Sequence, residues 1–149
     1  MIELKIKLDK GAKAPAYQSE GAAGMDISAL LSSGDLVIDP HGYRAIPTGV
    51  YLEIPEGYEV QVRPRSGLAF KSGITVLNSP GTIDSDYRGE IKVCLINHSD
   101  EPFVIHDGDR IAQLVLARYE RAVFSYENEL SLTDRGSNEI GRASCRERV

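Results

Sequence analysis

Short runs in which apolar and polar side chains alternate constrain the fold of this chain more than any other feature. Four such runs occur, at residues 2–8, 58–63, 91–96 and 110–119. An alternation with a period of two is typical of a β-strand that turns one face to a core. Between the runs stand turn sequences, namely DPHG at residue 39, PEG at 55, SPG at 79 and HDGD at 106. Short strands separated in this way predict an all-β sandwich, jelly roll or barrel.

One segment, RPRSGLAFKSG at residues 63–73, departs from this pattern. Ser66 can cap a helix start, the residues after it favour or tolerate a helix, and Gly73 can end one. The segment therefore predicts one short helix. Its first turn would offer free backbone N–H groups beside Arg65, an arrangement that binds anions. A plain capped helical turn without a ligand is an equally good interpretation.

Length and charge limit the classes of function. The 149 residues fit one domain with its own core. A formal net charge of -5 disfavours non-specific binding to nucleic acid or to an anionic membrane, so we expect neither as a partner. Two cysteines are too few for a disulfide scaffold, and the N-terminus has no apolar run of signal-peptide length. These features predict a cytoplasmic protein.

Several polar residues could carry chemistry. Asp84 and Asp86 lie in a turn at hairpin-like spacing, where acids commonly hydrogen-bond their own backbone. Tyr87 beside them could be an aromatic residue at a strand edge. Gln113 shares a strand face with apolar residues, and either a ligand or a neighbouring backbone group would satisfy its amide. Asp26 is a weaker, isolated signal. Each of these residues, taken alone, is compatible with a purely structural role.

Five motifs occur in order along the chain. They are AAGMDISA (22–29), RPRSGLA (63–69), NSPGTIDSDYRGEIKVCLIN (78–97), RIAQLVL (110–116) and TDRGS (133–137). Together they resemble the first four motifs, and the start of the fifth, of the trimeric dUTPase family (deoxyuridine 5′-triphosphate nucleotidohydrolases). The resemblance implies an all-β β-clip fold, a distorted jelly roll with one short helix, assembled as a homotrimer. It makes residues 1–137 one dUTPase-like domain.

The family's reaction converts dUTP and water into dUMP and pyrophosphate, with Mg2+ on the triphosphate. The resemblance makes Asp84 the general base that activates the attacking water. It places Tyr87 against the deoxyribose, where the ring would exclude a 2′-hydroxyl. The implied base pocket consists of side-chain or main-chain groups of Asn78, Thr82, Ile83 and Lys92.

Other motifs are implied to bind the triphosphate. The phosphate-binding residues expected from the resemblance are Arg65, Ser66, Gly67, Gln113 and Arg135. Asp26 would hold Mg2+ through a coordinated water, since Mg2+ commonly keeps several waters and binds through phosphates. Active sites of the family are composite. One subunit contributes motifs one, two and four, a neighbour contributes motif three, and the third subunit contributes motif five, so that one trimer would contain three equivalent sites.

The chain departs from the family after Ser137. The family continues with a glycine-rich stretch that contains a Phe, whereas residues 138–149 read NEIGRASCRERV. One interpretation is a divergent, arginine-rich lid. We favour another, in which EIGRASCRERV is the translation of a sequencing adapter and residues 138–149 are an atypical, non-native tail that impairs activity.

Two alternatives to a dUTP diphosphatase follow. Loss of the fifth motif would leave a non-catalytic or weakly active trimeric module that binds dUTP. A dCTP deaminase shares the fold, although motifs two and three resemble dUTPase and the chain has no additional deaminase-like motif. Ammonia release from dCTP would separate the two enzymes.

Overall fold

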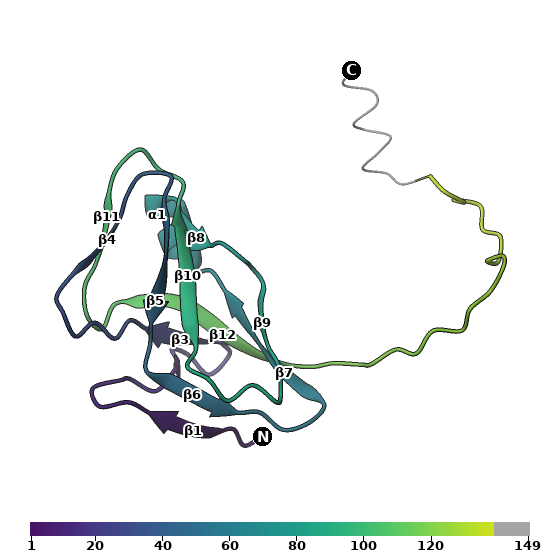
Figure 1. Ribbon diagram of the computed structural model, residues 1–149, viewed down its shortest axis with the longest axis horizontal. Coiled ribbons are helices and arrows are strands. Elements are labelled where there is room, and N and C mark those ends of the chain that lie inside the picture. Colours follow the sequence, from purple (N-terminus) through teal and green to yellow (C-terminus); the bar gives the residue numbers. More distant parts are fainter. Residues whose placement is uncertain (139–149) are drawn as a thin grey trace.

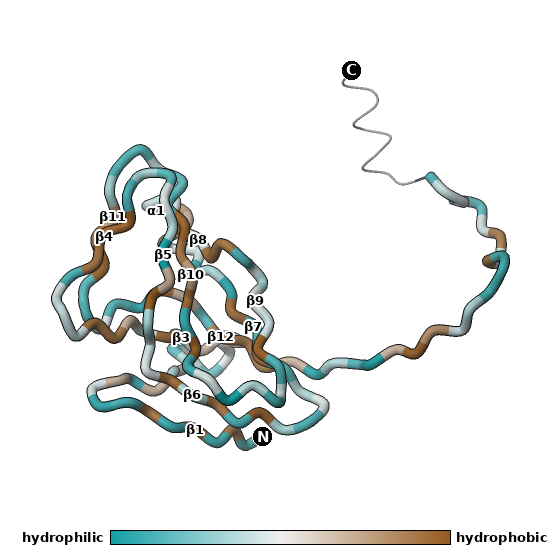
Figure 2. The backbone as a smooth tube through the Cα atoms, viewed as in Figure 1, coloured by the Kyte–Doolittle hydropathy of each residue, from teal (hydrophilic) through white to brown (hydrophobic). Residues whose placement is uncertain are grey.

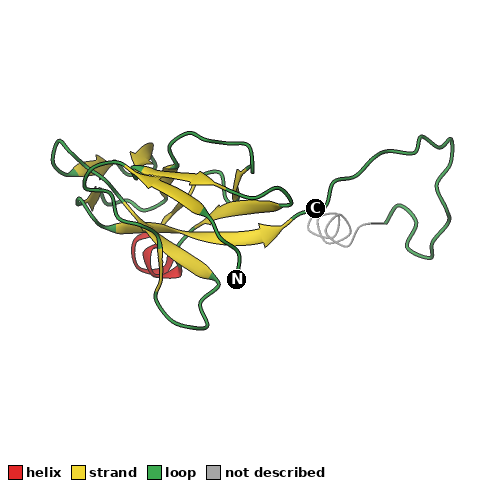
Figure 3. Cartoon of the chain, turned by 90° about the horizontal axis from the view of Figure 1, so that it is seen from below, coloured by secondary structure: helices red, strands yellow, loops and turns green. Residues whose placement is uncertain are grey.

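The computed structural model describes residues 1–138 and is built almost entirely of short strands (Figure 1). In chain order the strands are β1 (Lys5–Leu8), β2 (Ala16–Tyr17), β3 (Gly24–Ser28), β4 (Leu36–Ile38), β5 (Tyr43–Pro47), β6 (Val50–Glu53), β7 (Tyr58–Arg63), β8 (Ile74–Val76), β9 (Gly81–Ile83), β10 (Lys92–Asn97), β11 (Phe103–Ile105) and β12 (Arg110–Arg118). The helix of the described chain, α1, spans Ser66–Ser72 (Figure 3). The predicted all-β fold with one short helix is confirmed.

The strands pair antiparallel in four sheets. The orders are β2-β3-β12-β7-β9, β5-β10-β8, β1-β6 and β11-β4. β9 pairs with β7, whereas β10 pairs with β5 and β8. The turn between β9 and β10 was expected at hairpin-like spacing, but these two strands belong to different sheets. β9 is consequently an edge strand whose second edge faces away from its own sheet.

Apolar residues from all four sheets meet in one core. Fully buried side chains include Ile27, Ile46, Val60, Val93 and Leu114, which come from both of the larger sheets. Figure 2 shows the hydrophobic segments concentrated on the strands and the hydrophilic ones on the connecting loops. Burial of one such side chain contributes about 1.5–3 kcal/mol to folding, so this shared core holds the sheets in a fixed relation.

The first strand is shorter and more exposed than its alternation suggested. β1 begins at Lys5 rather than at residue 2, and the side chains of Ile6 and Leu8 remain 45% and 39% exposed. β1 pairs with β6 and lies at the outside of the molecule (Figure 1). Within residues 1–138 of one chain, its apolar positions do not join the core.

The start of α1 also differs from the prediction. Arg65 occupies the N-cap position without a side-chain capping bond, and Ser66 is the first helical residue rather than the cap. Gly73 ends the helix in the left-handed conformation with φ 65°, as predicted. Its N–H donates to the carbonyl oxygen of Ala69 at 3.1 Å. The short helix is therefore fixed at its C-terminal end.

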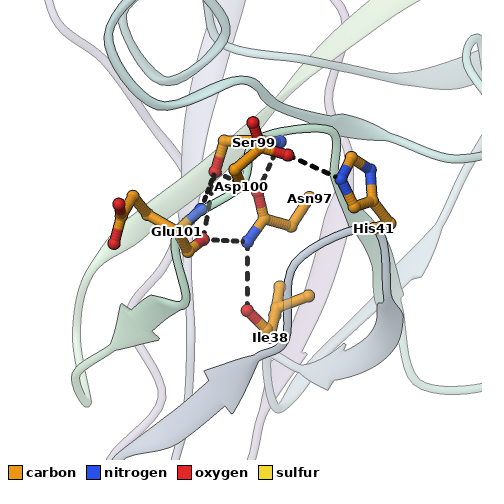
Figure 4. A network of polar contacts seen from close by, with 6 residues as sticks. All are labelled: Ile38, His41, Asn97, Ser99, Asp100 and Glu101. Atoms are coloured by element: carbon orange, nitrogen blue, oxygen red, sulfur yellow. Dashed lines mark hydrogen bonds and ion pairs between the residues drawn. The ribbon is translucent and has the colours of Figure 1, made fainter.

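The buried side-chain amide of Asn97 connects several backbone groups by hydrogen bonds (Figure 4). Asn97 is completely buried, and its Nδ2 donates to the carbonyl oxygens of Ile38 at 3.1 Å and Glu101 at 2.7 Å. Its Oδ1 accepts from the N–H of Ser99 at 2.9 Å. The backbone N–H of His41, a residue with φ 62°, donates to the carbonyl oxygen of Asn97 at 2.7 Å. The amide thus connects β4 to the loop after β10.

Residues 120–138 form an exposed arm that contains neither helix nor strand and extends away from the strands after β12 (Figure 1). Several large apolar side chains on the arm are more than four-fifths exposed, among them Phe124, Tyr126 and Leu132. Apart from Asn138, the atypical tail predicted at residues 138–149 lies outside the described residues. Within residues 1–138, no helix has the length and hydrophobicity needed to cross a membrane.

Candidate functional site

A tight turn follows β9. The N–H of Tyr87 donates to the carbonyl oxygen of Asp84 at 3.1 Å. Arg88 Nη1 donates to the carbonyl oxygens of Ser85 at 2.7 Å and Tyr87 at 3.1 Å. Within residues 1–138, the carboxylates of Asp84 and Asp86 make no hydrogen bond or ion pair. The turn is therefore held by its backbone and a guanidinium, and the alternative in which its acids bond their own backbone is wrong.

The turn borders a cavity of about 460 Å³, which we call the turn cavity. Its lining residues are Tyr51, Val62, Asn78, Gly81, Thr82, Ile83, Asp84, Tyr87, Glu90, Ile91 and Lys92. Most of them come from β9 and from the segment between β9 and β10, and Tyr51 and Val62 are contributed by β6 and β7. The structure therefore brings Asp84 together with every residue predicted to contact the nucleoside.

Tyr87 is fixed at the rim of the turn cavity although its side chain is 46% exposed. Its Oη donates to the carbonyl oxygen of Glu90 at 2.9 Å. Glu90 is held in turn, because its Oε2 accepts from the N–H groups of Thr48 at 3.2 Å and Gly49 at 3.0 Å. This chain of hydrogen bonds connects the aromatic ring to the loop between β5 and β6.

Tyr51 lines the turn cavity but was not identified from the sequence. Its Oη donates to Asp9 Oδ2 at 3.2 Å, and Lys7 Nζ lies 4.6 Å from the centre of its ring. Burial, followed by the nearby carboxylate of Asp9, raises the pKa of Tyr51 above its ordinary value. The phenol therefore remains a hydrogen-bond donor at neutral pH. Tyr51 lies outside the four alternating runs and outside the five motifs, so no sequence signal pointed to it.

A second group of candidate functional residues forms around Asp26, whose side chain is only 13% exposed. Its Oδ1 lies 3.3 Å from Arg65 Nε, and its Oδ2 lies 3.4 Å from Arg110 Nη1. We call these three residues the arginine cluster. Arg110 was not identified from the sequence, although it opens the motif RIAQLVL. A cation at the first position of that motif was the available signal.

Gln113 lies beside the arginine cluster, on the strand that pairs with both β3 and β7. Its Nε2 donates to the carbonyl oxygen of Pro64 at 3.0 Å, so a neighbouring backbone group satisfies the amide in this structure. Gly24 makes this contact possible, because a Cβ there would lie 2.9 Å from Gln113 Cδ. Gln113 thus braces the backbone that leads from β7 into Arg65 and Ser66.

The two groups do not form one site within the described chain. None of the predicted phosphate-binding residues lines the turn cavity. Ser66 and Gly67 open α1, beside the arginine cluster. Arg135 belongs to residues 120–138, the exposed arm that extends away from the strands (Figure 1).

The described residues are compatible with a Mg2+ ion that is coordinated mainly by a bound ligand and not by a set of protein side chains. Within residues 1–138, no group of three or more His, Cys, Asp or Glu side chains is placed to hold a metal. Asp26 Oδ1 and Oδ2 each face one guanidinium, and lone pairs remain on both oxygens. One carboxylate that reaches a metal through a coordinated water is compatible with the usual behaviour of Mg2+.

Comparisons with known proteins agree on one family. A family model described as dUTPase matches residues 10–144. The deoxyuridine 5′-triphosphate nucleotidohydrolase of Beijerinckia indica subsp. indica is 59% identical over 133 residues, which cover 89% of this chain and 83% of that protein.

Solved structures share the fold. A mutant of the Staphylococcus bacteriophage 80alpha dUTPase, in complex with dUpNHpp, superposes with a TM-score of 0.84 at 26% identity, covering 96% of this chain and 99% of that one. A mutant dUTPase from phage phi11 of S. aureus, described with a structural Mg(II) ion, gives a TM-score of 0.76 at 24% identity, covering 86% and 98%.

Proposed function

This chain belongs to the dUTPase family and hydrolyses dUTP to dUMP and pyrophosphate, and we propose how the turn cavity and the arginine cluster carry out that reaction. The observation that carries the proposal is the turn cavity, which gathers Asp84 and the predicted nucleoside-binding residues around one hollow. A dCTP deaminase or a non-catalytic dUTP-binding module is not favoured, because the similar proteins are nucleotidohydrolases.

The turn cavity binds the deoxyuridine. β9 uses one edge to pair with β7, so its other edge can present N–H and C=O groups to the uracil ring as a neighbouring strand would. Asn78 and the backbone at Thr82, Ile83 and Lys92 complete the base pocket. The ring of Tyr87 lies against the deoxyribose and leaves no room for a 2′-hydroxyl.

Asp84 is the general base. Its carboxylate is exposed and lines the turn cavity, and it has no partner within residues 1–138 that would compete for its lone pairs. It orients a water toward the α-phosphorus and accepts the proton of that water as the new P–O bond forms. The bond between the α-phosphorus and the bridging oxygen breaks, and pyrophosphate leaves with the electron pair.

The arginine cluster binds the phosphates. Arg65 and Arg110 already point their guanidinium groups at one anion, the carboxylate of Asp26, and phosphate oxygens are alternative acceptors for the same donors. Ser66 and the N–H of Gly67 add donors at the start of α1. Gln113 offers its amide beside Pro64. Arg135 is brought in by the arm.

Mg2+ is the proposed cofactor, and Asp26 would hold it through a coordinated water. When bound, the ion neutralises negative charge on the phosphate oxygens. Asp26 would position this water, and it is also the counter-charge that aligns both arginines. Positioning and charge neutralisation are the main contributions expected for attack at phosphorus.

The site is completed in a homotrimer. Asp84 of one chain would meet Arg65 and Ser66 of a second chain and Arg135 of the third. Two observations support this assignment: the phosphate-binding residues do not line the turn cavity, and the arm leaves the strands of its own chain.

We place the enzyme in the cytoplasm, which the small number of cysteines supports. The net charge of -5 supports the absence of nucleic-acid and membrane partners.

The activity is tested by measuring pyrophosphate release from dUTP and, in separate reactions, from dCTP, dTTP and UTP as alternative substrates. We expect release from dUTP alone. Release of ammonia from dCTP would contradict the assignment and indicate a deaminase.

The composite site is tested by mixing two variants of reduced activity. Asp84→Asn and Arg65→Ala damage different chains of each site. After the variants are unfolded and refolded together, about a quarter of the sites should contain neither substitution, and activity should return. Each variant refolded alone is the control. A mixture no more active than the average of its two parents, with a monomeric mass by light scattering, would contradict the trimer.

A further inference from the structure

Gly89 lies against the ring of Tyr87. A Cβ built on Gly89 would lie 2.6 Å from Tyr87 Cζ and 3.0 Å from Tyr87 Cε1. Gly89 does not have a positive φ, so its backbone does not require glycine. The glycine is therefore needed for space, because the phenol ring occupies the volume that any other side chain would fill.

A hydrogen bond also restrains the ring of Tyr87. Tyr87 Oη donates to the carbonyl oxygen of Glu90 at 2.9 Å. The carboxylate of Glu90 accepts from the N–H groups of Thr48 and Gly49 and is thereby tied to the body of the fold. The ring is thus held between the bare backbone of Gly89 and an anchored carbonyl, although almost half of the side chain is exposed.

We propose that Gly89 is a positioning residue that sets the selectivity of this enzyme for deoxyribose over ribose. The inference rests on the proposed function, in which the ring of Tyr87 forms the wall beside the sugar. A wall rejects one added hydroxyl only if it cannot move aside, and an exposed aromatic side chain rotates freely unless something restrains it. The gap at Gly89 lets the ring settle in the one position where Glu90 holds it.

The test is Gly89→Ala, assayed for kcat/KM with dUTP and with UTP. The added methyl group displaces the ring, so the ratio of the two values should fall roughly tenfold or more toward the ratio of Tyr87→Ala. The matched control is Gly21→Ala, since a Cβ at Gly21 meets nothing within 4 Å. It should keep the wild-type ratio. A folded Gly89→Ala protein with the wild-type ratio would overturn the inference.

Tyr87→Phe provides a second test that adds no atom to the chain. It keeps the ring and removes the hydrogen bond to Glu90, so the ratio should fall by a few-fold, less than in Tyr87→Ala. If Gly89→Ala does not fold, Tyr87→Phe decides: a lower ratio supports the restrained ring, and an unchanged ratio overturns it.

The wild-type enzyme separates this inference from the proposed function. If the wild-type protein does not hydrolyse dUTP, the proposed function is overturned, and the inference with it. If Tyr87→Ala still rejects UTP, the proposed role of Tyr87 is overturned, and the inference with it. A different set of results would overturn only the inference about Gly89. In that set, the wild-type protein rejects UTP and Tyr87→Ala accepts it, but Gly89→Ala still rejects UTP.

Discussion

The turn cavity and the arginine cluster are held together by different forces. The cavity comes largely from one stretch, residues 78–92, and its Tyr87 wall is restrained by hydrogen bonds to backbone groups. The arginine cluster draws on three distant segments and is held by ion pairs of 3.3 and 3.4 Å to one carboxylate.

In the proposed function, this difference separates recognition of the nucleoside's shape from recognition of the triphosphate's charge. A neutral nucleoside is selected by walls that stay where they are, so their contacts do not have to break when it binds. A triphosphate is an anion that can take over the donors now facing Asp26, so the arginines are aligned in advance but remain available. The two regions should therefore respond differently to substitution.

The largest effect is expected for Asp84→Asn, which removes the base from the turn cavity without changing the shape of the side chain. The value of kcat should fall about a thousandfold, within the usual contribution of a general base. Affinity for a non-hydrolysable dUTP analogue, measured by calorimetry, should change little. A variant with nearly wild-type kcat would remove Asp84 from this role.

Tyr87→Ala should break the shape of the cavity and leave the arginine cluster intact. We expect the selectivity for dUTP over UTP, measured as the ratio of kcat/KM values, to fall by up to about a hundredfold. The value of KM for Mg2+ should stay the same, because no phosphate contact is lost. Selectivity equal to that of the wild type would count against the ring as the sugar wall.

Arg65→Ala should break the arginine cluster and leave the cavity intact. Loss of a charge-assisted contact should lower kcat/KM for dUTP about tenfold or more, with selectivity against UTP unchanged. Arg63→Ala is the matched control, since Arg63 is exposed and bonds to Gln61 of its own strand. Equal losses in the two variants would show that general positive charge, rather than the cluster, matters.

The smallest effect is expected at the C-terminus. If residues 138–149 are non-native, they were never selected to close this site, and truncation after Ser137 should change kcat/KM by less than about twofold. Replacing them with a glycine-rich end that contains a Phe should raise it, because a closing lid excludes water and orders the phosphates. Loss of activity on truncation, without rescue by the graft, would identify the arginine-rich tail as a working lid.

Much of the fold and of the candidate site could be predicted from the sequence. The run YEVQVR is β7, and its alternating valines are buried as expected. Asp84, Tyr87 and Lys92 could be placed around one hollow because they lie within nine positions of each other in a motif that resembles a known family. The features that could not be predicted depend on which distant residues come into contact in the fold. Tyr51 lines the cavity from another strand, and Ser66 is not the helix cap.

Within residues 1–138, the sequence by itself determined four of the twelve strands, the one short helix and the residue types that could carry chemistry, because backbone periodicity and functional-group type are local properties. Only the tertiary structure decided that β9 and β10 part into different sheets and that Asp26 faces Arg110 across 84 positions of the chain. It also decided that Gly89 has no room for a side chain. These features follow from which distant atoms come into contact, and steric exclusion and Coulomb attraction act through space without regard to distance along the chain.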